Sequence, residues 1–172
     1  WASAVFGHSV TLFEKDSELG GSFRIAAYPT GKGQISAAVR AMIVRCEKAG
    51  VKVRLNTEAA LESIRSLAPD AVILATGSLP LLPSIPGLSD CGYITAQDML
   101  AGKGAVGKKV IVAGGGMIGC ETAEYLAERG HHVAVAEMKS TIAAEIAPEN
   151  RRYMFESFER NHVFLYPDAR IT

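Results

Sequence analysis

The sequence predicts an α/β protein in which parallel strands alternate with helices. Three observations lead to this fold class. Strand-like and helix-like segments alternate along most of the chain, a glycine-rich turn separates a strand from a helix near residue 115, and one short segment occurs twice. Strand–helix–strand order is typical of parallel sheets with right-handed crossovers. The composition, with 172 residues, no net charge and 48% hydrophobic residues, is that of an ordinary globular protein.

The first hundred residues contain the patterns of two strands, two helices and a buried strand. Runs of β-forming residues and apolar residues at helical spacing predict strands at 9–14 and 51–55 and helices at 34–49 and 59–66. The sequence Ala-Val-Ile-Leu-Ala at 71–75 is continuously apolar. Such a run is expected of a strand that is buried on both faces of a parallel sheet.

Prolines and glycines concentrate at 77–92, which predicts an irregular connection, and glycines recur just after residue 100. We therefore expect one unit at 1–100 and another at 101–172. The second unit should contain strands at 109–113, 132–137 and 163–166, and helices at 117–129 and 148–161. Pro148 stands at the first turn of the last helix, where proline is favoured.

Charge, hydropathy and cysteine usage exclude several classes of function. The neutral net charge argues against a nucleic-acid partner. No apolar run reaches the roughly 20 residues that span a bilayer, and the first residues lack a signal-peptide pattern, so we expect a cytoplasmic protein with no membrane partner. Cys46, Cys91 and Cys120 are far apart and form no CxxC pair. We therefore expect structural thiols and no metal site.

An internal repeat relates the two units. Residues 7–14 read GHSVTLFE and residues 130–137 read GHHVAVAE, so glycine, histidine, valine and glutamate coincide at a spacing of 123 positions. In the second copy a glycine-rich turn precedes the repeat, whereas its counterpart in the first copy would fall before Trp1. We expect the first unit to lack its first strand and phosphate-binding loop, and the second to be cut at its C-terminal end.

The strongest motif is the sequence VIVAGGGMIGCETAEYLAERGHHVAVAE at 110–137. Gly114, Gly116 and Gly119 fit a GxGxxG pattern that follows a strand, opens a helix and precedes a second strand. In such a motif the first glycine allows the tight turn and the second lets a pyrophosphate approach the backbone. The third lets the helix pack closely on the strand. The free N–H groups at the helix start would face the phosphates.

A carboxylate ends the second strand of this motif. Glu137 follows Gly119 by 18 residues, where it can accept hydrogen bonds from the hydroxyls of an adenosine ribose and repel a 2′-phosphate. NADH should therefore be preferred over NADPH, although the nearby cation of Lys139 softens that preference. By the repeat, Glu14 should hold the ribose of a first nucleotide. These features predict two Rossmann-like, three-layer nucleotide-binding units, both incomplete.

Three stretches of the chain carry a family resemblance: VTLFEKDSELGGSF, VILATGSLPLLPSIPG and VIVAGGGMIGCETAEYL. They resemble the nucleotide-binding half of the 2-enoate reductase and 2,4-dienoyl-CoA reductase family, and the layout is similar to that of trimethylamine dehydrogenase. The resemblance implies that residues near FAD are Glu14, Lys15, Gly20, Gly21, Ala75, Thr76 and Gly77. It implies that residues near NADH are Gly114, Gly115, Gly116, Ile118, Gly119, Glu121 and Glu137.

The resemblance also implies a reaction. Hydride would pass from NADH to FAD, and electrons would continue through an iron–sulfur cluster to FMN in a separate barrel, where an enoate or enoyl thioester is reduced. In some relatives ADP fills the FAD site. The barrel and its cluster are expected before this segment, so the segment alone should be inactive, and no catalytic residue is assigned.

Two other functions stay open from the sequence. The chain is alternatively a non-catalytic module that binds ADP or NAD, or part of an NADH oxidase from another flavoprotein family. A disulfide reductase is disfavoured because no CxxC pair is present. The expected partners are small-molecule nucleotides, and open sheet edges predict a homodimer.

Overall fold

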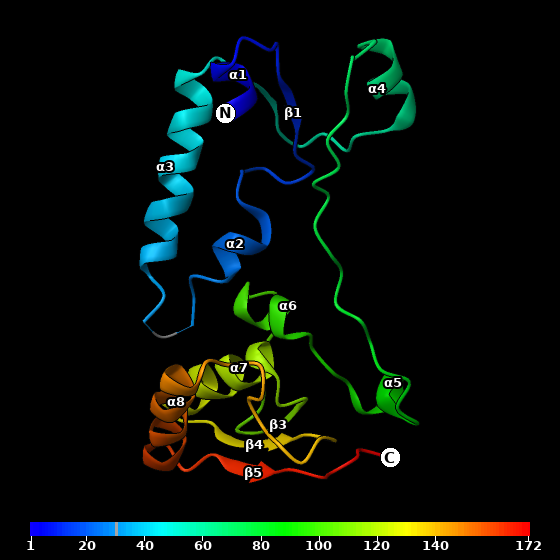
Figure 1. Ribbon diagram of the computed structural model, residues 1–172. Helices are drawn as coiled ribbons and strands as arrows, with labels where there is room; N and C mark the ends of the chain where they lie inside the picture. The colour runs from blue at the N-terminus through cyan, green and yellow to red at the C-terminus, as the bar shows by residue number, and fades with distance from the viewer. Residues whose placement is uncertain (30) are drawn as a thin grey trace. The chain divides into compact units, whose positions relative to one another are not determined.

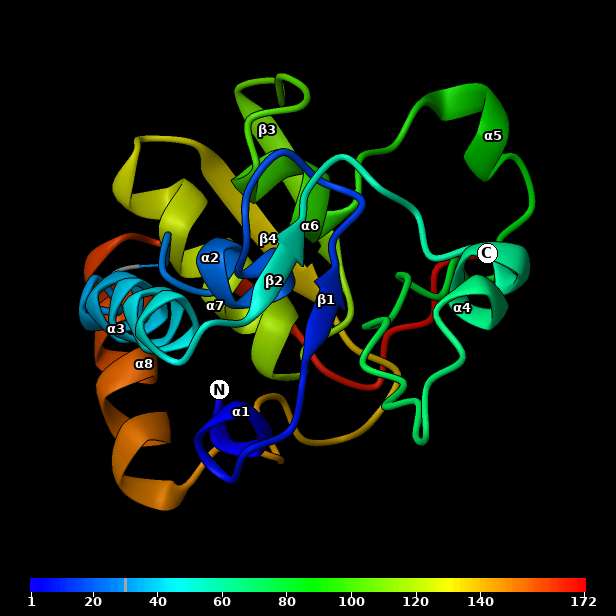
Figure 2. The same ribbon diagram turned by 90° about the horizontal axis from the view of Figure 1, so that it is seen from above.

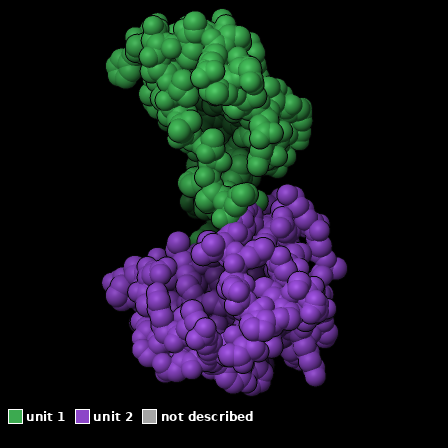
Figure 3. Space-filling view, turned by 90° about the vertical axis from the view of Figure 1, so that its right-hand side faces the viewer, with its two compact units in different colours: residues 1–27, 32–79 green, residues 28–31, 80–172 purple. Residues whose placement is uncertain are grey.

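The computed structural model describes residues 1–29 and 31–172. They form two compact units, one of residues 1–27 and 32–79 and one of residues 28–31 and 80–172 (Figure 3). The division falls after residue 79, earlier than the boundary near residue 100 that the sequence suggests. The reason is that helix α6 (Ala96–Leu100), with its buried Met99 and Leu100, packs on helix α7 (Met117–Glu128) of the second unit.

The second unit is built on a parallel three-stranded sheet in the order β3-β4-β5 (Figure 1). Strand β3 (Lys109–Ala113) leads through α7 to β4 (His132–Ala136), and helix α8 (Pro148–Arg160) then leads to β5 (Phe164–Tyr166). These elements agree with the sequence prediction to within a residue or two. Both connections are βαβ crossovers, as parallel pairing requires.

Side chains along each strand point alternately to the two faces of the sheet, and one of these faces is buried. Val133 and Val135 of β4 face the helices and are almost completely buried, together with Cys120 and Ala123 of α7 and Phe158 of α8. Burying a large apolar side chain contributes roughly 1.5–3 kcal/mol. Helices α7 and α8 cover this one face (Figure 1). On the other face, large apolar side chains are exposed at Ile111, Phe164 and Tyr166. A third layer over that face stays a prediction.

The first unit holds a two-stranded parallel sheet. Strand β1 (Thr11–Phe13) pairs with β2 (Lys52–Arg54), and helix α3 (Gln34–Lys48) connects them (Figure 2). Three shorter helices complete the unit: α1 (Ala2–Val5), α2 (Gly21–Ile25) and α4 (Leu61–Ser66). Helix α3 has the length expected from its apolar spacing, and Gly50 follows it at positive φ.

The internal repeat extends to backbone hydrogen bonds. The N–H of Glu14 donates to the carbonyl of Arg54, the last residue of β2, over 2.9 Å. The N–H of Glu137 donates in the same way to the carbonyl of Tyr166, the last residue of β5, over 3.0 Å. The segments β1-α3-β2 and β4-α8-β5 are therefore two copies of one βαβ arrangement.

The turns that follow β2 and β5 are also equivalent in the two copies. Thr57 donates its N–H to the carbonyl of Glu14 over 2.9 Å, and Ala169 donates to that of Glu137 over 2.9 Å. The residues before them, Asn56 and Asp168, both adopt positive φ, at 50° and 53°. Asparagine and aspartate tolerate this left-handed conformation better than most other residues. Each copy thus ends in the same turn, which closes beside the carboxylate-bearing strand end.

The sequence prediction of a strand at 71–75 is wrong. These residues adopt no strand, and Ile73 and Leu74 are 81% and 82% exposed. A strand exists only when its N–H and C=O groups pair with a neighbour. Within the described residues, the sheet of the first unit consists of β1 and β2 alone. The apolar run has β propensity but no strand to pair with.

One short helix interrupts the connection at 77–92 that the sequence predicts to be irregular, and a second short helix follows it. Helix α5 (Leu88–Cys91) falls within 77–92, and α6 follows Thr95. The side-chain oxygen of Thr95 accepts the N–H of Asp98 over 3.1 Å, and its hydroxyl donates to the Asp98 carboxylate over 2.8 Å. This Thr-x-x-Asp pattern is a helix-start signal visible in the sequence.

Among the described residues, no helix combines the length and apolarity needed to cross a membrane.

Two phenylalanines of the second unit provide a test of this packing. Phe158→Ala should lower the free energy of unfolding by about 3–5 kcal/mol, because Phe158 is 2% exposed between helix and sheet. Phe164→Ala is the matched control, since Phe164 is 59% exposed on the uncovered face. Denaturant unfolding measures both. Equal losses for the two variants would contradict the assignment of the buried face.

Candidate functional site

The glycine-rich loop connects β3 to α7 and begins with a left-handed residue. Gly114 has φ +107°, a conformation that residues with a side chain rarely adopt. Its N–H donates to the carbonyl of Ala136 at the end of β4 over 2.8 Å. The backbone therefore demands glycine here, and the loop starts from a fixed point on the sheet.

Gly119 is required by close packing. A Cβ on this residue would lie 1.9 Å from the carbonyl oxygen of Gly114 and 3.5 Å from Val112. The first contact is far inside van der Waals distance, and the opposing atom belongs to the backbone. The first turn of α7 therefore approaches the loop more closely than any side chain would permit.

Gly116 differs from both of these glycines. Its φ and ψ are −75° and −173°, which any residue adopts. A Cβ there would come no nearer than 3.7 Å to any protein atom, the nearest being a carboxylate oxygen of Glu145. Neither conformation nor packing demands glycine at this position. Space is left open beside the start of α7.

The backbone N–H and the carbonyl of Gly115 are both held by neighbouring elements. Its N–H donates to Oε2 of Glu137 over 2.7 Å. Its carbonyl oxygen accepts the N–H of Ala143 over 2.7 Å and the thiol of Cys120 over 3.3 Å. Gly115 is buried, as are Ala143 and Cys120. These three contacts fix the loop to the end of β4, to α7 and to the segment before α8. We call them the Gly115 clamp.

Glu137 is held as a carboxylate. Its Oε1 accepts the N–H of Lys139 over 2.8 Å, while Oε2 accepts that of Gly115. The backbone N–H of Lys139, then that of Gly115, and more weakly the Lys139 ammonium, lower the pKa of Glu137 below its ordinary value. The side chain therefore remains ionised at neutral pH. An ionised carboxylate has about four acceptor positions, so acceptors remain after these two bonds.

Cys120 is one of the three cysteines that the sequence predicts to be structural thiols, and it is buried, whereas Cys46 is half-buried and Cys91 is exposed. Burial raises its pKa to about 11, and the nearby carboxylates of Glu137 and Glu121 add to the rise. The thiol is therefore protonated at neutral pH and donates to Gly115. The sequence contained no signal for this contact, because it depends on how the first turn of α7 meets the loop.

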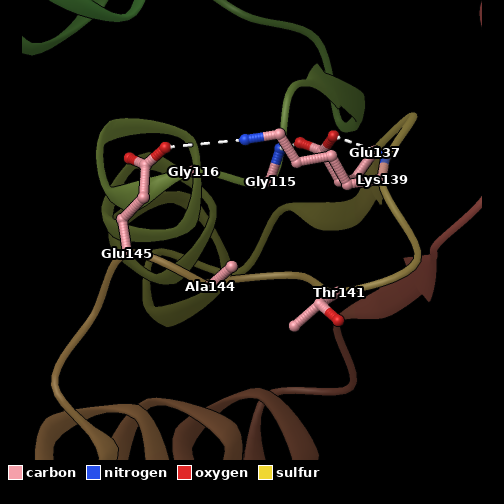
Figure 4. Close-up of a pocket in the computed structure, with 7 residues that line it drawn as sticks. All are labelled: Gly115, Gly116, Glu137, Lys139, Thr141, Ala144 and Glu145. Carbon is pink, nitrogen blue, oxygen red and sulfur yellow. Dashed lines mark hydrogen bonds and ion pairs between the residues drawn. The ribbon is translucent and has the colours of Figure 1, made fainter.

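A hollow lies beside the clamp (Figure 4). Its lining comes from the glycine loop, the end of β4 and the segment before α8, and consists of Gly115, Gly116, Glu137, Lys139, Thr141, Ala144 and Glu145. The ammonium of Lys139 pairs with Oε1 of Glu145 over 3.7 Å. Sequence reasoning missed Thr141, Ala144 and Glu145. They follow the strand in a loop whose path depends on Ala143 at φ +58°, and no sequence signal marks that conformation.

The other predicted residues of the second unit lie on the first two turns of α7. Ile118 is exposed, and Glu121 is half-buried. Neither is among the residues that line the hollow. Gly115, Gly116 and Glu137 therefore lie together in the lining of the hollow.

In the first unit, Glu14 reproduces the arrangement of Glu137. It follows β1, and its Oε1 accepts the N–H of Asp16, two residues on, over 3.0 Å. Asp16 and Lys139 are equivalent in the repeat. Lys15 beside it is exposed. The described structure shows no glycine-loop N–H donating to Glu14, whereas Gly115 donates to Glu137.

Gly20 and Gly21 precede and begin α2 at positive φ, +117° and +45°. A Cβ at Gly20 would lie 2.7 Å from Arg24 and 2.8 Å from Val39, so packing also demands glycine there. Ala75, Thr76 and Gly77 are exposed in the segment after α4, outside any regular element. Their assignment to a cofactor stays a prediction.

Comparison with known proteins places this fold in a family. Residues 4–172 match the family described as pyridine nucleotide-disulphide oxidoreductase. The chain belongs to this family. The description of the family indicates an oxidoreductase that uses a pyridine nucleotide.

Similarity to individual proteins is more specific than the family match. The chain is 43% identical over 158 residues to NADH oxidase of Thermoanaerobacter brockii, covering 90% of this chain and 24% of that protein. It is 40% identical over 140 residues to cinnamate reductase of Clostridium sporogenes, covering 81% and 21%. A solved structure of 2-naphthoyl-CoA reductase superposes with a TM-score of 0.91 at 32% identity, covering 96% and 25%.

These relatives confirm the resemblance to the 2-enoate reductase family that the sequence motifs suggested. The chain spans about a quarter of the length of the relatives it matches. The family and the relatives together support redox chemistry that uses a nicotinamide dinucleotide and a flavin.

Gly119→Ala should destabilise the protein by several kcal/mol, because the added Cβ meets a backbone carbonyl that cannot move without displacing the loop. Gly116→Ala should change stability by about 1 kcal/mol or less, since its Cβ makes only ordinary contacts. Thermal and denaturant unfolding of the two variants measure the difference. Similar stability of both would refute this division of roles.

The lowered pKa of Glu137 predicts a pH dependence. Its folded-state pKa lies below the unfolded value, so its contribution is fully present above the unfolded value and is lost as pH falls through the folded one. The stability difference between wild type and Glu137→Gln should be largest near neutral pH and should shrink on acidification. Denaturant unfolding across that range measures it. A difference that grows on acidification would show that the carboxylate is not held as described.

Proposed function

We propose that residues 80–172 of this oxidoreductase bind NADH, with its pyrophosphate on the glycine loop and its adenosine ribose on Glu137. The observation that carries the proposal is Gly116. Neither its backbone conformation nor its packing demands glycine, yet a Cβ would project into the hollow beside the start of α7. A bound pyrophosphate would need that space. The unpaired N–H groups and the positive dipole end of α7 favour an anion there.

Glu137 supplies the contacts for the ribose. It is ionised, and the Gly115 clamp and the N–H of Lys139 fix its direction. Its remaining acceptor positions would receive the ribose hydroxyls, and hydrogen bonds to a charged group contribute roughly 1.5–3 kcal/mol. The same charge would repel a 2′-phosphate. This supports a preference for NADH over NADPH.

The first unit is proposed to hold FAD, or ADP in its place. The equivalence of Glu14 and Glu137, down to the hydrogen bond from the N–H two residues on, supports a second ribose contact. Lys15 and the backbone at Gly20, Gly21 and Ala75–Gly77 would lie along the remainder of that cofactor. When bound, FAD would supply the acceptor for a hydride from NADH.

The part that this chain plays in the reaction is binding and positioning. Holding two reactants in the right geometry accounts for much of the rate of a bimolecular step, and no acid or base from this chain is required. Glu121 on α7 would face the nicotinamide side. In the whole protein we propose that electrons continue through an iron–sulfur cluster to FMN and reduce an enoate or enoyl thioester. The names of the cinnamate and 2-naphthoyl-CoA reductases support that substrate class.

Two alternatives compete with this proposal. The similarity to an NADH oxidase favours oxygen or another acceptor in place of an enoate. A non-catalytic ADP- or NAD-binding module would bind nucleotide without flavin, so the visible absorbance of the purified protein separates it from an enzyme. We retain a cytoplasmic location, nucleotide partners and a homodimer as proposals, which cell fractionation and sedimentation would test.

Titration of the purified protein with NADH by calorimetry tests the nicotinamide site. Gly116→Ala should weaken NADH binding by roughly 10- to 100-fold, because its Cβ would displace the pyrophosphate from charge-assisted N–H contacts. Gly107→Ala is the matched control, since a Cβ there meets nothing nearer than 3.9 Å and the residue lies before β3, outside the hollow. Glu137→Ala should weaken NADH binding and reduce the difference in affinity between NADH and NADPH. Unchanged NADH affinity in Gly116→Ala, with stability retained, would refute the proposed site.

A further inference from the structure

The hollow beside Glu137 contains a charge pair that the proposed function does not use. Among the residues described as its lining, Lys139 is the only cation, and its ammonium pairs with Glu145 over 3.7 Å. Both side chains come from the segment between β4 and α8, and Figure 4 shows their charged ends pointing toward each other. A carboxylate oxygen of Glu145 would also be the nearest atom to a Cβ placed on Gly116, at 3.7 Å.

Lys139 is fixed close to the proposed ribose contact. Its own N–H donates to Oε1 of Glu137, so the residue that bears the ammonium is attached to the carboxylate that would hold the ribose hydroxyls. A phosphate on the 2′-hydroxyl would add nearly two negative charges at this place. A free lysine there would attract such a group, which is why Lys139 alone weakens the expectation of NADH preference.

The backbone of Glu145 is also held in place. Ile142 and Ala143 are buried, and the N–H of Ala143 belongs to the Gly115 clamp. Ile146 donates its N–H to the carbonyl of Ala143 over 3.1 Å, and α8 begins at Pro148. Glu145 therefore lies between two anchored points. Its carboxylate lies 3.7 Å from the Lys139 ammonium, and both side chains are about two-thirds exposed, at 69% for Lys139 and 67% for Glu145.

We propose that Glu145 is a specificity-determining residue, which neutralises Lys139 and so makes the site reject the 2′-phosphate of NADPH. The inference rests on the proposed binding of NADH at Glu137. With Glu137 and Glu145 negative and Lys139 positive, the three charges around the ribose position sum to one negative charge. Without Glu145 they sum to zero, and the lysine becomes available to the phosphate.

The test is a double-mutant cycle on the purified protein, with NADH and NADPH titrated separately. Glu145→Gln should improve NADPH affinity roughly fivefold relative to NADH, the size expected of one exposed charge contact. Adding Lys139→Ala should abolish that gain, because the cation that receives the phosphate is gone. Glu159→Gln removes one exposed carboxylate from the last turn of α8, away from the hollow, and should leave the ratio unchanged.

Salt provides a second readout, because exposed charges more than a few ångströms apart are screened at about 1 M ionic strength. The gain in NADPH affinity should shrink as salt rises. An equal gain for both nucleotides would overturn the inference, since Glu145 would then repel only the pyrophosphate that they share. A gain that survives Lys139→Ala would overturn it as well. Failure of the wild-type protein to bind NADH would instead refute the proposed function.

Discussion

The Gly115 clamp is the contact on which the arrangement of the second unit depends. The backbone of one residue connects the glycine loop to three other parts of the chain: the carboxylate at the end of β4, the first turns of α7 and the loop that precedes α8. Backbone hydrogen bonds join neighbouring strands of any parallel sheet. The Gly115 clamp adds hydrogen bonds beyond the ends of these strands, beside the hollow. The direction of Glu137 and the position of the glycine loop are therefore not independent.

This coupling has a consequence for electrostatics. A carboxylate near the start of a helix would be stabilised by the helix dipole alone, but only loosely positioned. Here two backbone N–H groups hold it and lower its pKa, so charge and direction are both set before any ligand arrives. The protonated thiol of Cys120 contributes from the buried side as a neutral donor. A thiolate at that place would repel the carboxylate.

The repeat shows what the βαβ arrangement provides and what it does not. Glu14 and Glu137 share the bond to the next strand, the turn beyond it and the bond from the N–H two residues on. Those features come from the strand–helix–strand segment itself. The second hydrogen bond to Glu137 comes from the N–H of Gly115 in the glycine loop. Among the described residues of the first unit, no such loop donates to Glu14. Equivalent sequence therefore produces an equivalent carboxylate, but the preorganisation of Glu137 needs a glycine loop beside it.

The sequence by itself determined the elements whose signals are local. Apolar spacing predicted α3, the glycine motif predicted α7, and Pro148 marked the start of α8. The motif also placed Gly114, Gly116, Gly119 and Glu137 correctly relative to strand and helix. Only the tertiary structure decided the remainder. The apolar run at 71–75 is no strand because pairing depends on a neighbour and not on propensity. Glu145 joined the hollow because a buried alanine at positive φ turns the loop, which no residue pattern announces. The motif predicts separate roles for its glycines, and the structure supplies the physical basis: Gly114 needs its positive φ, Gly119 its close contact with the Gly114 carbonyl, and Gly116 neither.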